Sequence, residues 1–197
     1  MKTTNKLLTL IIIFSSLFSL QSQNKFSKRK IENLKEEVSQ LVEDDKKMTQ
    51  VMIDKVFSFG ELGFQEFETS KYLGKILEEN GFDVEYQISD IPTSWLATWS
   101  NGEGGPTIAL GSDFDGVPST SQYPGVAYEK PVVEGAPGHG EGHNIGLPIV
   151  ITSAIAIKKI MIENNINGKL VLWPGVAEEI LGAKAWYVRD GYFDNVD

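Results

Sequence analysis

Apolar side chains return every three or four positions along the first part of the chain. Over residues 28–58 this spacing predicts one long helix or two short ones, because such positions share one face of a helix. A second stripe over residues 72–77 predicts a helix that begins near Thr69. Gly81 is well placed to end that helix, since glycine readily adopts the left-handed conformation that closes many helices.

Shorter apolar segments predict strands. Residues 83–88 alternate between apolar and polar side chains, and residues 94–99 form the next candidate. Residues 107–112 and 169–173 are compact apolar runs, which are typical of strands buried on both faces. Because helical and strand segments alternate after residue 66, the sequence predicts an α/β layer architecture with a mostly parallel sheet.

The segment 147–162 is almost wholly apolar. It is shorter than the roughly 20 residues that a membrane-spanning helix needs, so it predicts a buried helix with Pro148 in its first turn. The preceding residues, 118–146, are rich in glycine, proline and serine and show no regular pattern. A loop of that length in a compact domain usually carries function.

The first 22 residues have the pattern of a secretory signal peptide. Lys2 and Lys6 precede an apolar run over residues 7–20, and a polar segment, 21–23, follows. We therefore expect cleavage near residues 20–23 and export to the periplasm or the extracellular space, without stable membrane insertion after processing. A retained amino-terminal anchor is the alternative. The chain has no cysteine, which excludes a lipid-anchored cysteine and a disulfide framework.

Composition narrows the class of partner. The chain has 197 residues, of which 41% are hydrophobic, so it can bury a core of one domain. Its formal net charge is −9 at pH 7. An acidic surface repels phosphate backbones, and nucleic-acid binding is therefore not expected.

Two histidines, the only two in the chain, flank a carboxylate in the loop that precedes the apolar helix. His139, Glu141 and His143 alternate with glycines, which let the backbone turn sharply. Imidazole nitrogen and carboxylate oxygen suit a borderline metal ion such as zinc. The alternative is a glycine-rich surface loop with two solvated imidazoles.

Two acidic pairs follow the two compact apolar strands. Asp113 and Asp115 come after residues 107–112, and Glu178 and Glu179 come after residues 169–173. Sites in open α/β sheets form beyond the carboxyl ends of strands, so the pairs are expected near the histidine segment. Taken singly, the aspartates could cap a turn, and the glutamates could favour the start of a helix that runs to about Asp190.

Metal-assisted hydrolysis is the chemistry that fits these groups. A metal ion activates water and polarises a carbonyl, while a carboxylate that is not a ligand removes the proton. The chain contains no phosphate-binding loop, no G-x-S-x-G elbow and no cysteine nucleophile. A glycosidase with two carboxylates would leave the histidine segment unexplained.

Five stretches of the chain resemble the amino-terminal half of the M20 family of metallopeptidases and amidohydrolases. Within that family they look most similar to the aminobenzoyl-glutamate hydrolase branch, in its B-type subunit. The matching stretches are residues 60–70, 111–118, 135–144, 172–179 and 182–184, in the order of the family. The resemblance implies a three-layer α/β/α zinc-peptidase-like catalytic domain.

The resemblance also implies roles for the candidate residues. Glu141, His143 and Glu179 match metal ligands, and Glu178 matches the general base. Asp113 and Asp115 match an acidic pair near the metals, with an orienting role for Asp115, and His139 matches a motif histidine. The implied cofactor is a divalent metal, zinc first, with manganese or cobalt as alternatives.

The implied function is hydrolysis of an amide bond in an acyl-amino-acid or aminobenzoyl-glutamate-like small molecule. Family members supply two further histidine ligands and a lid or dimerisation domain, and this chain has no histidine after His143. We therefore expect residues 23–197 to be the amino-terminal part of a catalytic domain, truncated before the rest. The missing half, or a homodimer as in full-length relatives, is the expected protein partner. The alternative function is an inactive fragment that binds metal weakly at most.

Overall fold

The computed structural model describes residues 26–197, so the predicted signal peptide at residues 1–22 lies outside the described part. The chain divides into two compact units between Glu36 and Glu37, within the first described helix. The layers and the site described below all belong to residues 37–197. The amino-terminal region of helical spacing forms two helices, α2 (Lys28–Asp44) and α3 (Lys46–Phe59), in agreement with the second of the two predicted arrangements.

Glycine closes both α3 and the helix that follows it. Gly60 ends α3 with φ 54° and donates its N–H to the carbonyl of Val56. Helix α4 (Phe67–Glu79) ends at Asn80, and Gly81 follows in the left-handed conformation with φ 74°. The predicted role of Gly81 in ending this helix is confirmed.

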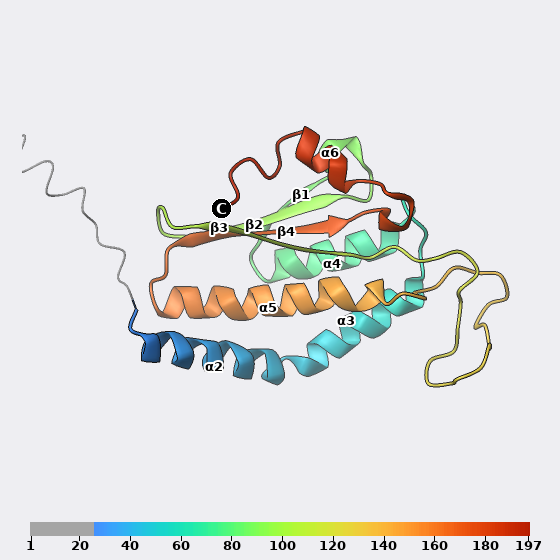
Figure 1. Cartoon of the computed structure of the whole chain (residues 1–197), viewed down its shortest axis with the longest axis horizontal. Coiled ribbons are helices and arrows are strands. Elements are labelled where there is room, and N and C mark those ends of the chain that lie inside the picture. The colour runs from blue at the N-terminus through green and yellow to red at the C-terminus, as the bar shows by residue number, and fades with distance from the viewer. Residues whose placement is uncertain (1–25) are drawn as a thin grey trace, which may run out of the picture. The chain divides into compact units, whose positions relative to one another are not determined.

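A mixed four-stranded sheet forms the middle layer (Figure 1). Its strands are β1 (Asp83–Tyr86), β2 (Trp95–Asn101), β3 (Thr107–Asp113) and β4 (Gly168–Gly175), in the order β1-β2-β4-β3. Only β3 and β4 pair in parallel, while β1–β2 and β2–β4 are antiparallel.

The α/β class is confirmed, but the described sheet is not mostly parallel as predicted. The connection between β1 and β2 is short, and a short connection permits only an antiparallel neighbour. The connection between β3 and β4 contains a long loop and a helix, which is the crossover that a parallel pair requires.

Helix α5 (His143–Glu163) is the crossover helix, and it packs against β3, β4 and α3. It begins four residues earlier than predicted, so Pro148 lies in its second turn rather than in its first. By length and composition alone this helix could cross a membrane. Its buried residues include Leu147, Ile151 and Ala154, all fully enclosed, which identifies it as a core helix.

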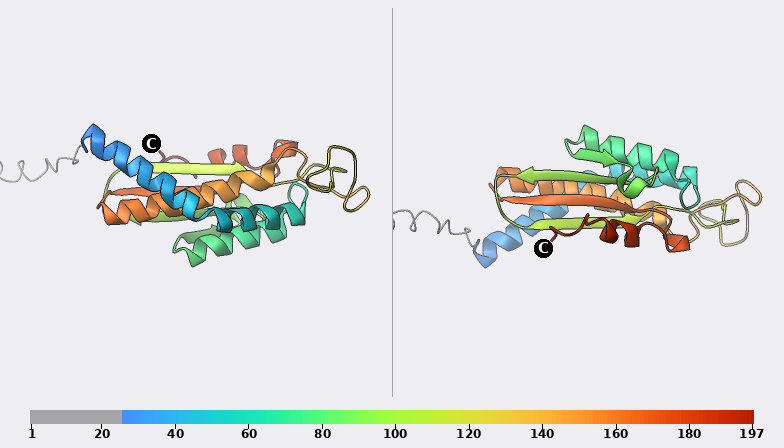
Figure 2. Two further views of the ribbon diagram at one scale, coloured as in Figure 1. Left: turned by 90° about the horizontal axis from the view of Figure 1, so that it is seen from below. Right: turned by 90° about the horizontal axis from the view of Figure 1, so that it is seen from above.

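Helices cover both faces of the sheet, which gives the three layers that were expected. Helices α4 and α5 lie on one face, and α6 (Lys184–Arg189) lies on the other (Figures 1 and 2). On the α6 face, the ring of Trp173 packs edge-on against Tyr187 and Phe193, with centroid distances of 6.4 and 5.3 Å. Tyr187 is completely buried there.

Two predictions for the strands and the acidic pair were wrong. Strand β3 lies at the edge of the sheet, and 41% of Ile108 is exposed, so β3 is not buried on both faces as β4 largely is. Residues 178–190 do not form one helix: Glu178–Ile180 form a short 3-10 turn, η2, and α6 begins only at Lys184.

The packing of α5 generates a stability prediction. We expect Ile151→Ala to lower the free energy of unfolding by about 2–5 kcal/mol, because it removes a fully buried side chain from the core and leaves a cavity. The matched control is Ile149→Ala on the same helix, where 47% of the side chain is exposed and the loss should stay near 0.5 kcal/mol. Urea unfolding measures both, and similar losses for the two variants would contradict the placement of α5.

Candidate metal centre

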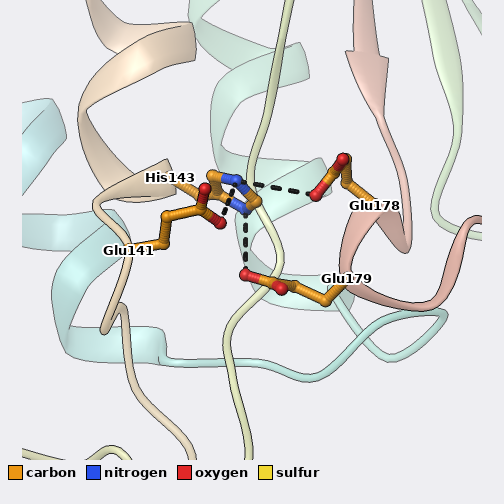
Figure 3. Close-up of side chains that lie close together, drawn as sticks. All are labelled: Glu141, His143, Glu178 and Glu179. Carbon is orange, nitrogen blue, oxygen red and sulfur yellow. Dashed lines mark ion pairs between the residues drawn. The ribbon is translucent and has the colours of Figure 1, made fainter.

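Four predicted site residues come together beyond the carboxyl ends of β3 and β4. Glu141 lies in the loop before α5, His143 is the first residue of α5, and Glu178 and Glu179 lie in η2 after β4. One ligand atom from each of the four lies within 4.8 Å of the others. Figure 3 shows the three carboxylates grouped around the imidazole of His143.

The imidazole of His143 is held from behind by Asp115. Its Nδ1 atom lies 3.2 Å from Oδ1 of Asp115 and 3.2 Å from the carbonyl oxygen of the same residue. Its Nε2 atom lies 3.2 Å from Glu141 and 3.9 Å from Glu178. An outer carboxylate that fixes the ring of a ligand histidine is a common feature of metal sites.

Asp115 also contacts the backbone of the acidic turn. Its second carboxylate oxygen accepts the N–H of Glu179 at 3.1 Å, and its side chain is fully buried. One enclosed carboxylate therefore orients both the imidazole and the turn that carries Glu178 and Glu179. The orienting role predicted for Asp115 needs such contacts, and the role itself stays a prediction.

The charges of the cluster fit a cation. Three carboxylates this close repel one another unless a proton or a positive ion lies among them. Burial, and then the neighbouring carboxylate of Glu141, raises the pKa of Glu179. The donor set of one imidazole and several carboxylates suits a divalent metal ion. The described residues thus fit a divalent metal ion, as the sequence led us to expect.

The backbone around Glu178 and Glu179 is strained. Ala177 has φ 53° and ψ 42°, and Leu181 has φ 58°, both in the left-handed region that residues with a side chain rarely occupy. The two glutamates lie between these residues in a 3-10 turn. The alternative interpretation, in which they are acidic residues at the start of an α-helix, is therefore wrong. Strain of this kind is frequent at functional sites.

Asp113 and His139 lie outside the four-residue cluster. Asp113 pairs with Nζ of Lys184 at 2.8 Å, and the same ammonium lies 3.8 Å from Glu178. Nε2 of His139 lies 3.1 Å from the carbonyl oxygen of Val56, and burial lowers the pKa of this imidazole, which favours its neutral form. The structure therefore gives neither residue a direct place among the ligand atoms.

Sequence reasoning assigned no role to Lys184 or Glu66. Lys184 links Asp113 to Glu178. Glu66 is completely buried, accepts the N–H of Ala177 at 2.9 Å and the hydroxyl of Thr93 at 2.9 Å, and has a pKa raised by burial. Both residues fall within the stretches that carried the family resemblance, which was the only available signal.

Comparison with known proteins gives related sequences for most of the chain. It is 32% identical over 160 residues to the B-type subunit of p-aminobenzoyl-glutamate hydrolase from Escherichia coli, covering 81% of this chain and 33% of that protein. It is also 32% identical over 139 residues to hippurate hydrolase of Campylobacter jejuni, covering 70% of this chain and 33% of that protein. The chain thus spans about a third of the length of these relatives. No protein-family model matches it.

A solved structure supports the fold. A dinuclear metal-binding peptidase of the M20 family from Bacillus subtilis superposes with a TM-score of 0.63 at 24% identity. The match covers 78% of this chain and 42% of that one. At this level of identity the likeness concerns the fold, and it confirms the α/β architecture of an M20 peptidase catalytic domain.

The buried carboxyl of Glu66 generates a prediction about pH. Its pKa in the folded chain lies above the ordinary value of 4.5, so the folded state holds its proton more tightly than the unfolded state does. Ionisation of Glu66 therefore lowers the stability of the wild type as pH rises above that value. We expect the melting temperature of Glu66→Gln, relative to wild type, to increase from pH 4 to pH 7. A difference that stays constant or falls over this range would contradict the raised pKa.

Proposed function

Since the chain belongs to the M20 family of metallopeptidases and amidohydrolases, we propose that it binds a divalent metal ion, with zinc as the first choice, for the hydrolysis of an amide bond. Glu141, His143 and Glu179 hold the ion in this proposal. The observation that carries it is the convergence of these donor atoms within 4.8 Å, in front of the buried carboxylate of Asp115.

Glu178 is the proposed general base. When bound, the metal ion lowers the pKa of water and polarises the substrate carbonyl. Glu178 is a third exposed, so it can exchange protons with solvent. Glu178 and Glu179 each lie 3.9 Å from the His143 ring, but from different nitrogens, Nε2 and Nδ1. Consecutive side chains that diverge in this way allow one to bind the ion while the other accepts a proton.

The substrate is proposed from the relatives. Their names describe hydrolysis of p-aminobenzoyl-glutamate and of hippurate, and each of these compounds joins an acyl group to an amino acid through an amide. We propose the same class of small amide for this chain. A hollow of about 670 Å³ beside Glu141, lined in part by Phe57, His139 and Asn144, offers space next to the proposed ion. A second protein chain is a further proposal, since the Escherichia coli relative is named as a subunit.

The ligand assignment predicts unequal roles for the two histidines. We expect His143→Ala to weaken zinc or cobalt binding by about 10–100-fold or more, because it removes a nitrogen donor from the cluster. The control is His139→Ala, which removes the other histidine and should leave affinity within about threefold, since its ring bonds to Val56 rather than to the cluster. Isothermal titration calorimetry measures both, and equal losses would refute the assignment.

The role of Glu178 predicts a separation of binding from turnover. In metal-loaded protein, Glu178→Gln should reduce the hydrolysis of hippurate or p-aminobenzoyl-glutamate by about 10²–10⁴-fold while metal affinity stays near that of the wild type. Product release measured by chromatography gives the rate, and calorimetry gives the affinity. A wild-type chain that binds metal but releases no product above the level of Glu178→Gln would favour the alternative of a metal-binding chain without activity of its own.

A further inference from the structure

We propose that Glu66 is a positioning residue that fixes the turn carrying Glu178 and Glu179 in the orientation needed to face His143. This inference rests on the proposed metal centre and adds a residue that lies outside it. Glu66 is none of the four clustered residues, and it precedes α4 in the chain, 111 residues before the turn that it contacts.

The first observation is the bond between Glu66 and the strained residue of the turn. Its Oε1 atom accepts the N–H of Ala177 at 2.9 Å, and Ala177 is the left-handed residue directly before Glu178. A peptide in this conformation finds no partner for its N–H in a regular ladder or helix, so a buried acceptor must be brought to it. The carboxylate of Glu66 supplies that acceptor from another part of the chain.

The second observation is how completely Glu66 is enclosed. None of its surface is exposed, and its other oxygen accepts the hydroxyl of the equally buried Thr93 at 2.9 Å. Burying a carboxyl group is unfavourable unless its hydrogen bonds are made. Glu66 is thus locked by Thr93 on one side and presents a fixed acceptor to Ala177 on the other.

The third observation is that the whole segment Glu61–Glu66, here called the bracing loop, lies against the residues behind the centre. A Cβ atom on Gly63 would lie 3.0 Å from Ala177 and 3.4 Å from Oδ2 of Asp115, so a side chain there would push Ala177 away by a few tenths of an ångström. The carbonyl of Glu61 accepts the N–H of Gly116, the residue after Asp115, at 2.6 Å. The bracing loop therefore contacts both supports of the centre, namely Asp115 behind His143 and Ala177 before Glu178.

The test compares two substitutions of Glu66 in the full chain. Glu66→Gln keeps an oxygen that can accept the N–H of Ala177, whereas Glu66→Met has a similar length but no oxygen acceptor, only a weakly accepting sulfur. Hydrogen exchange of the peptide 176–183, followed by mass spectrometry without metal, reports how firmly the turn is held. Cobalt affinity and the visible absorption spectrum of bound cobalt report the geometry of the centre.

We expect Glu66→Met to speed exchange in residues 176–183 by about 10-fold or more. It should also weaken cobalt binding by about 10–100-fold and alter its spectrum. Glu66→Gln should stay within about threefold of wild type in both measurements. The control is Thr152→Val, which removes a part-buried hydrogen bond of 2.7 Å between the buried Thr152 of α5 and Thr49 of α3 and should change neither exchange in this peptide nor the cobalt spectrum.

The outcomes separate this inference from the proposed metal centre. Unchanged exchange of residues 176–183 in Glu66→Met would overturn the inference, whatever the metal does. Faster exchange with an unchanged cobalt spectrum and affinity would also overturn it, because Glu66 would then support the fold without orienting the ligands. If wild type binds no cobalt, the metal centre fails, while faster exchange in Glu66→Met alone still supports the hold of Glu66 on the turn.

Discussion

Parallel pairing of β3 with β4 brings the chemistry of this chain to one place. The register pairs Asp113 with Gly175, so the carboxyl ends of both strands lie side by side, and the segments after them leave the sheet at the same end. Asp115 follows one strand, and Glu178 and Glu179 follow the other. Helix α5, which connects the two strands, begins at His143 near the same end of the sheet. The centre therefore exists only where this ladder and its crossover helix have formed.

At this end of the sheet, buried carboxylates hold the backbone of the site, and carboxylates that solvent reaches form the cluster. Asp115 and Glu66 are enclosed, and each accepts a backbone N–H from the segment 177–179. Glu141, Glu178 and Glu179 are all reached by solvent, and the pKa of Glu179 is raised. This division places fixed hydrogen-bond acceptors behind the site and negative charge at its mouth, where a cation relieves the repulsion.

The sequence predicted the elements better than their pairing. Helical spacing located α2, α3 and α4, and apolar runs located β3 and β4, because periodicity reports which face of an element is buried. Periodicity does not report the direction of a neighbouring strand, so the antiparallel pairs of β1 and β2 were missed. The 3-10 turn was missed as well, since the acidic pair Glu178–Glu179 resembles an ordinary helix start and the left-handed Ala177 has no local signature.

The residues of the cluster were predictable from their motifs and from the family resemblance, whereas the support that Glu66 contributes from another loop was not. Glu141, His143, Glu178 and Glu179 were all predicted from the sequence, and the structure brings them together. Of the acidic pair, only Asp115 was predicted to orient a ligand; it lies beyond the end of β3 and contacts His143, whereas Asp113 pairs with Lys184. Glu66 acts across 111 residues, and its partner could not be inferred from local pattern.

The long crossover between β3 and β4 also determines when the centre can appear during folding. In an unfolded chain, the four clustered residues form two separate pairs, Glu141 with His143 and Glu178 with Glu179, and a single pair of donors holds an ion weakly. The two pairs meet only after the parallel ladder has closed a connection of more than 50 residues, which is a slow type of contact to form. A metal ion at this centre therefore binds late on the folding pathway. It can stabilise the finished sheet, but it cannot act as the nucleus around which the chain first collapses.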